Sequence, residues 1–280
     1  MPYDDRAKSG GAMLRDLRLR SGLTLLDLAG RLDDADLRID TAHLHRIESG
    51  RIARPAATTI ESILQAGYGA PYLVRRDVLD AYGYRLPWEL PTASEIADMQ
   101  RLLANELDTA TWPVYFMDYS LRIWGWNRYF PRLLGTGPDD PRNAAFMGVT
   151  HIDIVLNPAL GTAGQIHNAH EFAPLMLTMF RLLAQPYQHQ QWYTDFVDRA
   201  HTWPGFPELW AALPDDDHLS PLQQVLPVEI SVPGVDPVMR FRITTITFSL
   251  DPRFQIVHLI PFGAATLREC ATWAEAAGEP

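Results

Sequence analysis

The residues LRLRSGLTLLDLA, from Leu17 to Ala29, decide the fold of the N-terminal part of the chain. Leucines and arginines are interspersed up to position 20, which predicts a short helix with an apolar and a basic face. Thr24 and Asp27 follow with the spacing of a capping box, in which each side chain accepts a hydrogen bond from the backbone N–H of the other residue. The stretch therefore predicts two short helices separated by a tight turn at Ser21-Gly22.

More short helices are expected after this pair. The polar stretch 33–38 predicts a turn, and Asp40 is placed to cap a third helix that ends at Ser49-Gly50. Apolar residues at helical spacing predict two further helices, over 58–65 and 72–82. Short helices joined by tight turns, with arginines near the third, are typical of a helix-turn-helix DNA-binding domain.

The stretch 17–29, together with LHRIESGR at 44–51, resembles the Cro/repressor (XRE) family of helix-turn-helix regulators. The resemblance implies that Glu48 pairs with Arg18 and so ties the third helix to the first. It also implies sequence-specific binding to double-stranded DNA. Residues 33–39 form a longer connection than is usual in that family.

The same resemblance implies which side chains face DNA. Arg46 is the natural hydrogen-bond donor to guanine, and Ala42 can touch a thymine methyl group. The alternative is that the arginines are solvated surface charges, but the agreement of periodicity, caps and motif favours DNA binding. The expected major-groove residues are Thr41, Ala42, His43 and Arg46, and the expected phosphate contacts are Thr24, Arg51 and Arg54.

A further helix is expected in the middle of the chain. Thr92 and Glu95 repeat the capping-box spacing, and apolar residues recur at helical spacing from Ile96 to Leu107. Two interpretations stay open, namely a helix that packs on its own C-terminal domain and a connecting or dimerising helix. We expect a homodimer on a palindromic operator, because two-fold half-sites match a two-fold protein.

The C-terminal part has the pattern of an α+β domain. Short β-branched and aromatic runs at 114–118 and 122–126 predict a hairpin, and a largely helical stretch, 172–213, follows. Three more strands are expected near the end of the chain. Together these patterns predict a two-domain protein: an all-α helix-turn-helix domain and an α+β domain, whose five-stranded antiparallel sheet is covered on one face by helices. The last three expected strands are 225–232, 239–248 and 255–260.

The stretch 113–127 resembles the opening of the MmyB-like ligand-binding domain, and short motifs around Asn157, Ala173 and Phe180 and the run 204–210 follow in that domain's order. The resemblance implies a PAS-like sensor for a small lipophilic, fatty-acid-like ligand. We expect no obligatory cofactor. The expected segments are a flexible tail at 1–11, the helix-turn-helix domain at 12–90, a connecting helix at 91–110, the PAS-like domain at 111–268 and a C-terminal tail at 269–280.

Aromatic and sulfur-containing side chains in this domain are candidates for an apolar pocket. For any one of them, filling the core is the simpler interpretation, because aromatics at helix or strand spacing usually just pack. A carboxylate ligand needs a basic anchor, for which Arg181, Arg242 and His258 are candidates. The candidate ligand contacts are Trp124, Trp126, Phe130, Phe146, Met176, Met179, Phe180, Arg181, Trp192, Phe196, Phe241, Phe248 and His258.

Composition and charge narrow the class of protein. The chain has 280 residues, one cysteine and a net charge of −10. Residues 1–60 hold 10 basic and 9 acidic groups, so the acidity lies almost wholly in the C-terminal part and the charge permits DNA binding. With no apolar run of membrane-spanning length and no signal peptide, a cytoplasmic protein is expected.

Enzyme and metalloprotein classes are not favoured. The sequence has no GxSxG, Walker or Rossmann motif. His167, His170 and Glu171 resemble a metal cluster, but a third ligand, such as His151 or Asp153, must come from distant sequence, and no metal site is expected. The alternative to a lipid sensor is a sensor with a prosthetic group, such as haem held by His258. A third class is a protein-interaction module that uses the helix-turn-helix only as a scaffold.

Overall fold

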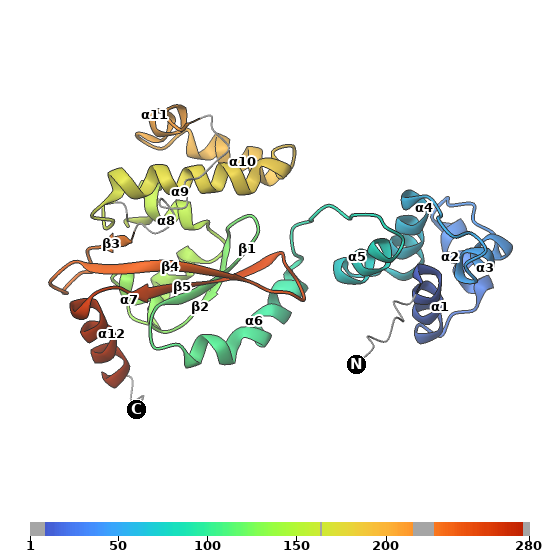
Figure 1. Cartoon of the computed structure of the whole chain (residues 1–280), viewed down its shortest axis with the longest axis horizontal. Coiled ribbons are helices and arrows are strands. Elements are labelled where there is room, and N and C mark those ends of the chain that lie inside the picture. The colour runs from blue at the N-terminus through green and yellow to red at the C-terminus, as the bar shows by residue number, and fades with distance from the viewer. Residues whose placement is uncertain (1–8, 163, 215–226, 277–280) are drawn as a thin grey trace, which may run out of the picture. The chain divides into compact units, whose positions relative to one another are not determined.

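The protein divides into two units in a computed structural model that describes residues 9–162, 164–214 and 227–276. One unit covers Met1–Glu89 and the other covers Leu90–Pro280. The first is helical, and the second is built on a β-sheet (Figure 1). This is the two-domain fold that the sequence predicts. In the described part of the chain, no helix is long and apolar enough to cross a membrane.

The N-terminal unit is a small bundle of short helices around a leucine and isoleucine core. Leu28, Leu32, Leu44 and Ile47 are almost completely buried in it. The expected fourth helix, at 58–65, changes partway into a π-helical turn. The elements are α1 (Gly10–Arg20), α2 (Leu25–Asp34), α3 (Thr41–Glu48), α4 (Ala57–Ser62), the π-helical turn Ile63–Gly67 and α5 (Tyr72–Ala81).

Two side chains start these helices as the sequence predicts. Thr24 and Asp27 form the reciprocal capping box of α2. The carboxylate of Asp40 accepts a hydrogen bond of 2.6 Å from the backbone N–H of His43 and so caps α3. Because α2 runs to Asp34, the turn before α3 begins later than the polar stretch that predicts it. These caps fix where α2 and α3 begin.

The C-terminal unit contains a five-stranded antiparallel sheet in the order β2-β1-β5-β4-β3. The first hairpin and the last two strands agree with the sequence prediction within one or two residues. The expected strand at 225–232 is shorter in the structure, and its first two residues lie outside the described part. The strands are β1 (Val114–Asp118), β2 (Ile123–Trp126), β3 (Val228–Ile230), β4 (Met239–Thr247) and β5 (Phe254–Pro261).

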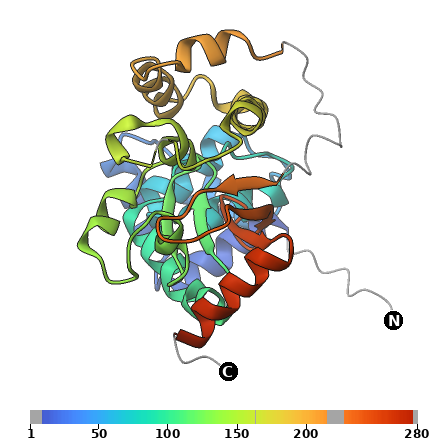
Figure 2. The same cartoon turned by 90° about the vertical axis from the view of Figure 1, so that its left-hand side faces the viewer.

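Helices lie on both faces of this sheet, not on one as the sequence pattern indicates. In both views, α9 to α11 lie on one side and α6 and α12 on the other (Figure 1, Figure 2). The helix α12 continues past position 268, which is the end of the domain predicted from the sequence. These helices are α6 (Ala93–Thr109), α7 (Phe130–Leu133), α8 (His151–Leu156), α9 (Ala169–Ala184), α10 (Gln191–Ala200), α11 (Phe206–Ala211) and α12 (Ala264–Ala276).

The sheet separates two clusters of side chains because neighbouring residues of a strand point to opposite faces. Phe116 of β1 and Ile256 of β5 are fully buried in the cluster that contains Leu103 of α6. Tyr115 and Val257, one position away, line a cavity on the other face. The sheet is therefore the wall between α6 and the cavity.

Candidate DNA interface and ligand cavity

The exposed face of α3 is the candidate DNA interface. The helix buries Leu44 and Ile47 and leaves Ala42 and Arg46 exposed. Thr41 and His43 at its first turn are half-buried. The structure therefore puts all four expected major-groove residues on α3, two of them exposed.

One exposed residue of α3 is missing from the predicted set. His45 lies three positions after Ala42 and one before Arg46, and its side chain is exposed. Residues three apart on a helix share a face. That spacing is the signal that could have found His45, which we add to the candidate interface.

An ion pair holds the end of α3 against α1. Arg18 Nε lies 2.8 Å from Glu48 Oε1, and the Arg18 NH2 group lies 2.9 Å from Glu48 Oε2. Arg18 also donates to the carbonyl oxygen of Leu23 at 2.9 Å. The hydrogen bonds to Glu48 raise the pKa of Arg18. The pairing of these two residues, which the family resemblance implies, is confirmed.

The three expected phosphate contacts are all exposed, but they differ in what they contact. The hydroxyl of Thr24 donates to Asp27 Oδ2 at 2.7 Å, so the capping box occupies it. The guanidinium of Arg54 lies over the ring of Tyr84, 5.2 Å from its centre. Arg51 is exposed in the turn after α3. Their contact with DNA stays a prediction.

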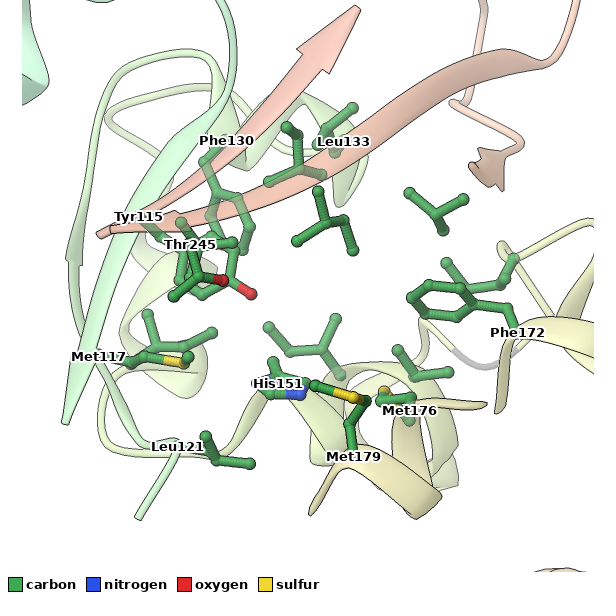
Figure 3. A pocket seen from close by; sticks show the side chains of 18 of the residues that line it. Tyr115, Met117, Leu121, Phe130, Leu133, His151, Phe172, Met176, Met179 and Thr245 are labelled. Carbon is green, nitrogen blue, oxygen red and sulfur yellow. The ribbon is translucent and has the colours of Figure 1, made fainter. Parts of the chain in front are cut away.

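A cavity of about 500 Å³ lies between the sheet and the helices α8 and α9 (Figure 3). This volume is within the usual range for small-molecule pockets, about 300–1,000 Å³. Its wall is mostly aliphatic, aromatic and thioether. The lining residues include Tyr115 and Met117 from β1, Phe130 from α7, His151 and Val155 from α8, Phe172, Met176, Met179 and Phe180 from α9, Ile243 and Thr245 from β4, and Val257 from β5.

Four of the candidate ligand contacts line this cavity, namely Phe130, Met176, Met179 and Phe180. The others lie elsewhere in the unit. Trp192 and Phe196 belong to an aromatic cluster behind Phe180, and Trp124 and Trp126 border a separate hollow against α6. Phe146 and Phe241 are buried, and Phe248 packs against the α6 cluster.

The three candidate basic anchors are engaged away from the cavity. Arg181 donates to the carbonyl oxygen of Pro214. The guanidinium of Arg242 lies 4.4 Å from the centre of the Phe262 ring. His258 accepts a hydrogen bond of 3.3 Å from Trp112 Nε1, on the opposite face of β5 from Val257. That position also separates His258, the candidate haem ligand, from the cavity.

His151, expected from the sequence only as a candidate distant metal ligand, lines the cavity. It is the first residue of α8 and directly follows the N-cap Thr150, which forms a capping box with Asp153. Its Nδ1 atom is buried and has no hydrogen-bond partner in the described part of the chain. Burial lowers the pKa of His151 to about 4, against a smaller opposing effect of Asp153. The ring is therefore neutral at pH 7.

His170 and Glu171, which resemble part of a metal cluster in the sequence, have no third ligand beside them in the described part of the chain. His170 Nε2 lies 3.7 Å from Glu171 Oε1, and both side chains are exposed. Within the described ranges, no group of three or more histidine, cysteine, aspartate or glutamate residues could hold a metal ion.

Two family models match the chain. A model described as a helix-turn-helix domain matches residues 11–79. A model described as an MmyB-like transcription regulator ligand binding domain matches residues 97–268, which is more than half of the chain. Comparison with curated proteins gives no match. The first match covers α1 to α5 up to position 79, and the second covers the sheet and the cavity.

Proposed function

The chain belongs to the MmyB-like transcription regulators and is a ligand-responsive regulator with a DNA-binding helix-turn-helix domain, and we propose that a lipophilic, fatty-acid-like molecule in the cavity controls operator binding. The single observation that supports this ligand class is the cavity itself. Its wall is predominantly apolar, including Phe130, Phe172 and Met176. Apolar walls with a few polar groups are typical of small-molecule sites.

We propose that the sheet transmits the effect of ligand binding to α6 and so to the DNA-binding domain. Side chains of β1 and β5 alternate between the cavity and α6, and α6 lies directly after the DNA-binding unit in sequence. A ligand that moves Tyr115 or Val257 thereby acts on the strands against which α6 packs. This sensing mode, a PAS-like sheet with its ligand on one face and a signalling helix on the other, is our proposal.

Regulation requires two conformations that the ligand binds with different affinity. We propose a homodimer that contacts two half-sites of a palindromic operator through the α3 helices. Ligand binding then changes, through α6, the distance between the two α3 helices that contact the half-sites. Because DNA half-sites lie about one helical turn apart, a small movement of α6 suffices to weaken binding.

The first test is to find the bound molecule. The full-length protein is purified, examined by native mass spectrometry and then extracted with organic solvent. A stoichiometric lipophilic species supports the proposal. A protein that carries haem, seen by its visible absorbance, or one that neither carries nor binds any lipophilic compound, contradicts the ligand class.

The second test uses a variant with a filled cavity. Met176→Trp adds bulk where α9 meets the cavity, whereas Leu267→Trp makes the same kind of change on the exposed surface of α12. The first variant is expected to lose the ligand and its effect on operator affinity, and the second is expected to keep both. Equal ligand response in both variants contradicts the proposed site.

A further inference from the structure

The cavity wall carries no formal charge in the described part of the chain. Lysine, arginine, aspartate and glutamate are all missing from its lining residues. The nearest arginine in sequence to the α9 lining residues, Arg181, is engaged with the carbonyl oxygen of Pro214. A carboxylate inside this cavity therefore meets no cation to replace its hydration, and burying an unpaired charge is strongly unfavourable.

The polar groups of the wall are neutral hydrogen-bonding groups. The phenol of Tyr115 and the hydroxyl of Thr245 point into the cavity (Figure 3). Burial raises the pKa of Tyr115, so the phenol stays protonated. His151 contributes an imidazole that burial keeps uncharged. These groups suit a dipolar oxygen, and they do not compensate an anion.

His151 also has unused hydrogen-bonding capacity. A neutral imidazole has one donor and one acceptor nitrogen. In the described part of the chain the buried Nδ1 has no partner, and the surroundings of the ring include the thioethers of Met176 and Met179 (Figure 3). Nδ1 itself is covered by protein, but the residue as a whole is only half-buried and lines the cavity, so a bound polar group meets the ring at its other edge.

We propose that the cavity selects an uncharged lipophilic molecule with one hydrogen-bonding oxygen group, such as an alcohol, ketone or ester, and that His151 recognises that group. This inference rests on the proposed function and specifies its ligand further: the lipophilic chain is kept, and an uncharged oxygen group takes the place of the carboxylate of a fatty acid. The hydrocarbon part of the molecule lies against the apolar wall. The oxygen group bonds to the imidazole, with Tyr115 and Thr245 as further neutral partners.

The test compares two probes that differ only in the polar group. Binding of 1-decanol and of decanoate to the full-length protein is measured by isothermal titration calorimetry at pH 8, where decanoate is ionised. We expect the alcohol to bind at least ten-fold more tightly. If decanoate binds as tightly or more tightly, the inference is wrong while the proposed lipophilic site stands. If neither probe binds, the proposed site fails and the inference fails with it.

Variants of His151 test its role in recognition. His151→Leu removes the hydrogen-bonding group and is expected to weaken 1-decanol binding about ten-fold, while His151→Gln, which keeps a donor and an acceptor, is expected to weaken it less than three-fold. Binding of the dye Nile red shows that each variant retains the cavity. Should His151→Leu fail to fold, Tyr115→Phe provides the second variant, with an expected loss of at least two-fold. Unchanged 1-decanol affinity in the folded variants overturns the role of these residues.

Discussion

Arg253 and Glu95 form an ion pair of 2.9 Å that joins the turn before β5 to the first turn of α6. The side chain of Arg253 is 1% exposed, and Asp251 holds it from the other side at 2.8 Å. Burial raises the pKa of Glu95, but hydrogen bonds from Arg253 and Thr92 outweigh this and the net pKa lies below its ordinary value. The start of α6 is thus attached to the sheet through a buried guanidinium.

Glu95→Gln is expected to destabilise the C-terminal unit by about 2 kcal/mol, because it removes one of the two carboxylates that pair with the buried guanidinium of Arg253. Glutamine still satisfies the capping box, so the loss is specific to the ion pair. Urea unfolding followed by tryptophan fluorescence measures it, since seven of the eight tryptophans belong to this unit.

The matched control for that change is Asp98→Asn, also on α6. Asp98 pairs with Arg101, and both side chains are more than 60% exposed. Exposed pairs contribute little, so a change within about 0.5 kcal/mol is expected. Equal losses in the two variants are incompatible with a special role for the buried pair.

Arg46→Ala and Arg51→Ala should affect DNA binding in different ways. Arg46 is exposed on α3 and Arg51 lies in the turn after it. Loss of a base contact relaxes sequence preference and costs about 1–3 kcal/mol at one position, whereas loss of a phosphate contact weakens binding to all sequences and reduces its salt dependence. Selection from a randomised DNA pool, followed by affinity measurement at several salt concentrations, separates the two effects. If Arg46→Ala leaves the selected sequence unchanged, α3 is not the recognition helix in this orientation.

Glu48→Gln is expected to destabilise the N-terminal unit by about 2 kcal/mol, because Arg18 then lacks its carboxylate in a largely buried site. Operator affinity should fall with it, since α3 loses its attachment to α1. Urea unfolding followed by circular dichroism and operator titration provide the two measurements. Asp77→Asn, which removes an exposed partner of Arg76 on α5, is the control and should change stability by less than about 0.5 kcal/mol. A control variant that loses as much as Glu48→Gln contradicts the interpretation.

Local signals explain why most of the fold follows from the sequence. Thr24, Asp40 and Thr92 each start a helix where their side chains predict it, because a cap depends on residues only two or three positions apart. Alternating β-branched and aromatic residues likewise locate β1 and β5. The position of α12 on a second face of the sheet has no such local signal.

The cavity was predicted less well than the fold because its wall comes from distant segments. Phe130 and Met176 were found among the aromatic and thioether residues, but so were Trp192 and Phe241, which pack elsewhere. A sequence pattern separates buried from exposed positions, yet it does not tell which buried side chains leave space between them. His151 illustrates the difference, because only the fold of α8 brings it to the wall of the cavity.

The depressed pKa of His151 predicts that the ligand-free protein loses stability on acidification. The pKa is about 4 in the folded state and about 6.5 in the unfolded state. The unfolded chain therefore binds more protons at this site below pH 6.5, and its contribution to stability falls as the pH decreases from 6.5 towards 4. We expect the wild type to lose up to ~1.4 kcal/mol per pH unit more than His151→Gln in this window.

Urea unfolding at pH 7.5, 6.5, 5.5 and 5.0 measures this difference, and every other histidine and carboxylate is common to the two proteins. Asp153 is the acidic group that acts on His151, and it slightly favours the charged ring, while its own contact with Arg199 at 3.2 Å limits that effect. If the two proteins lose stability in parallel below pH 6.5, His151 is not buried in its neutral form. The inference that the cavity wall is uncharged, on which the proposed ligand selectivity depends, would then be wrong. A ring that accepts a proton inside the cavity can also pair with a carboxylate.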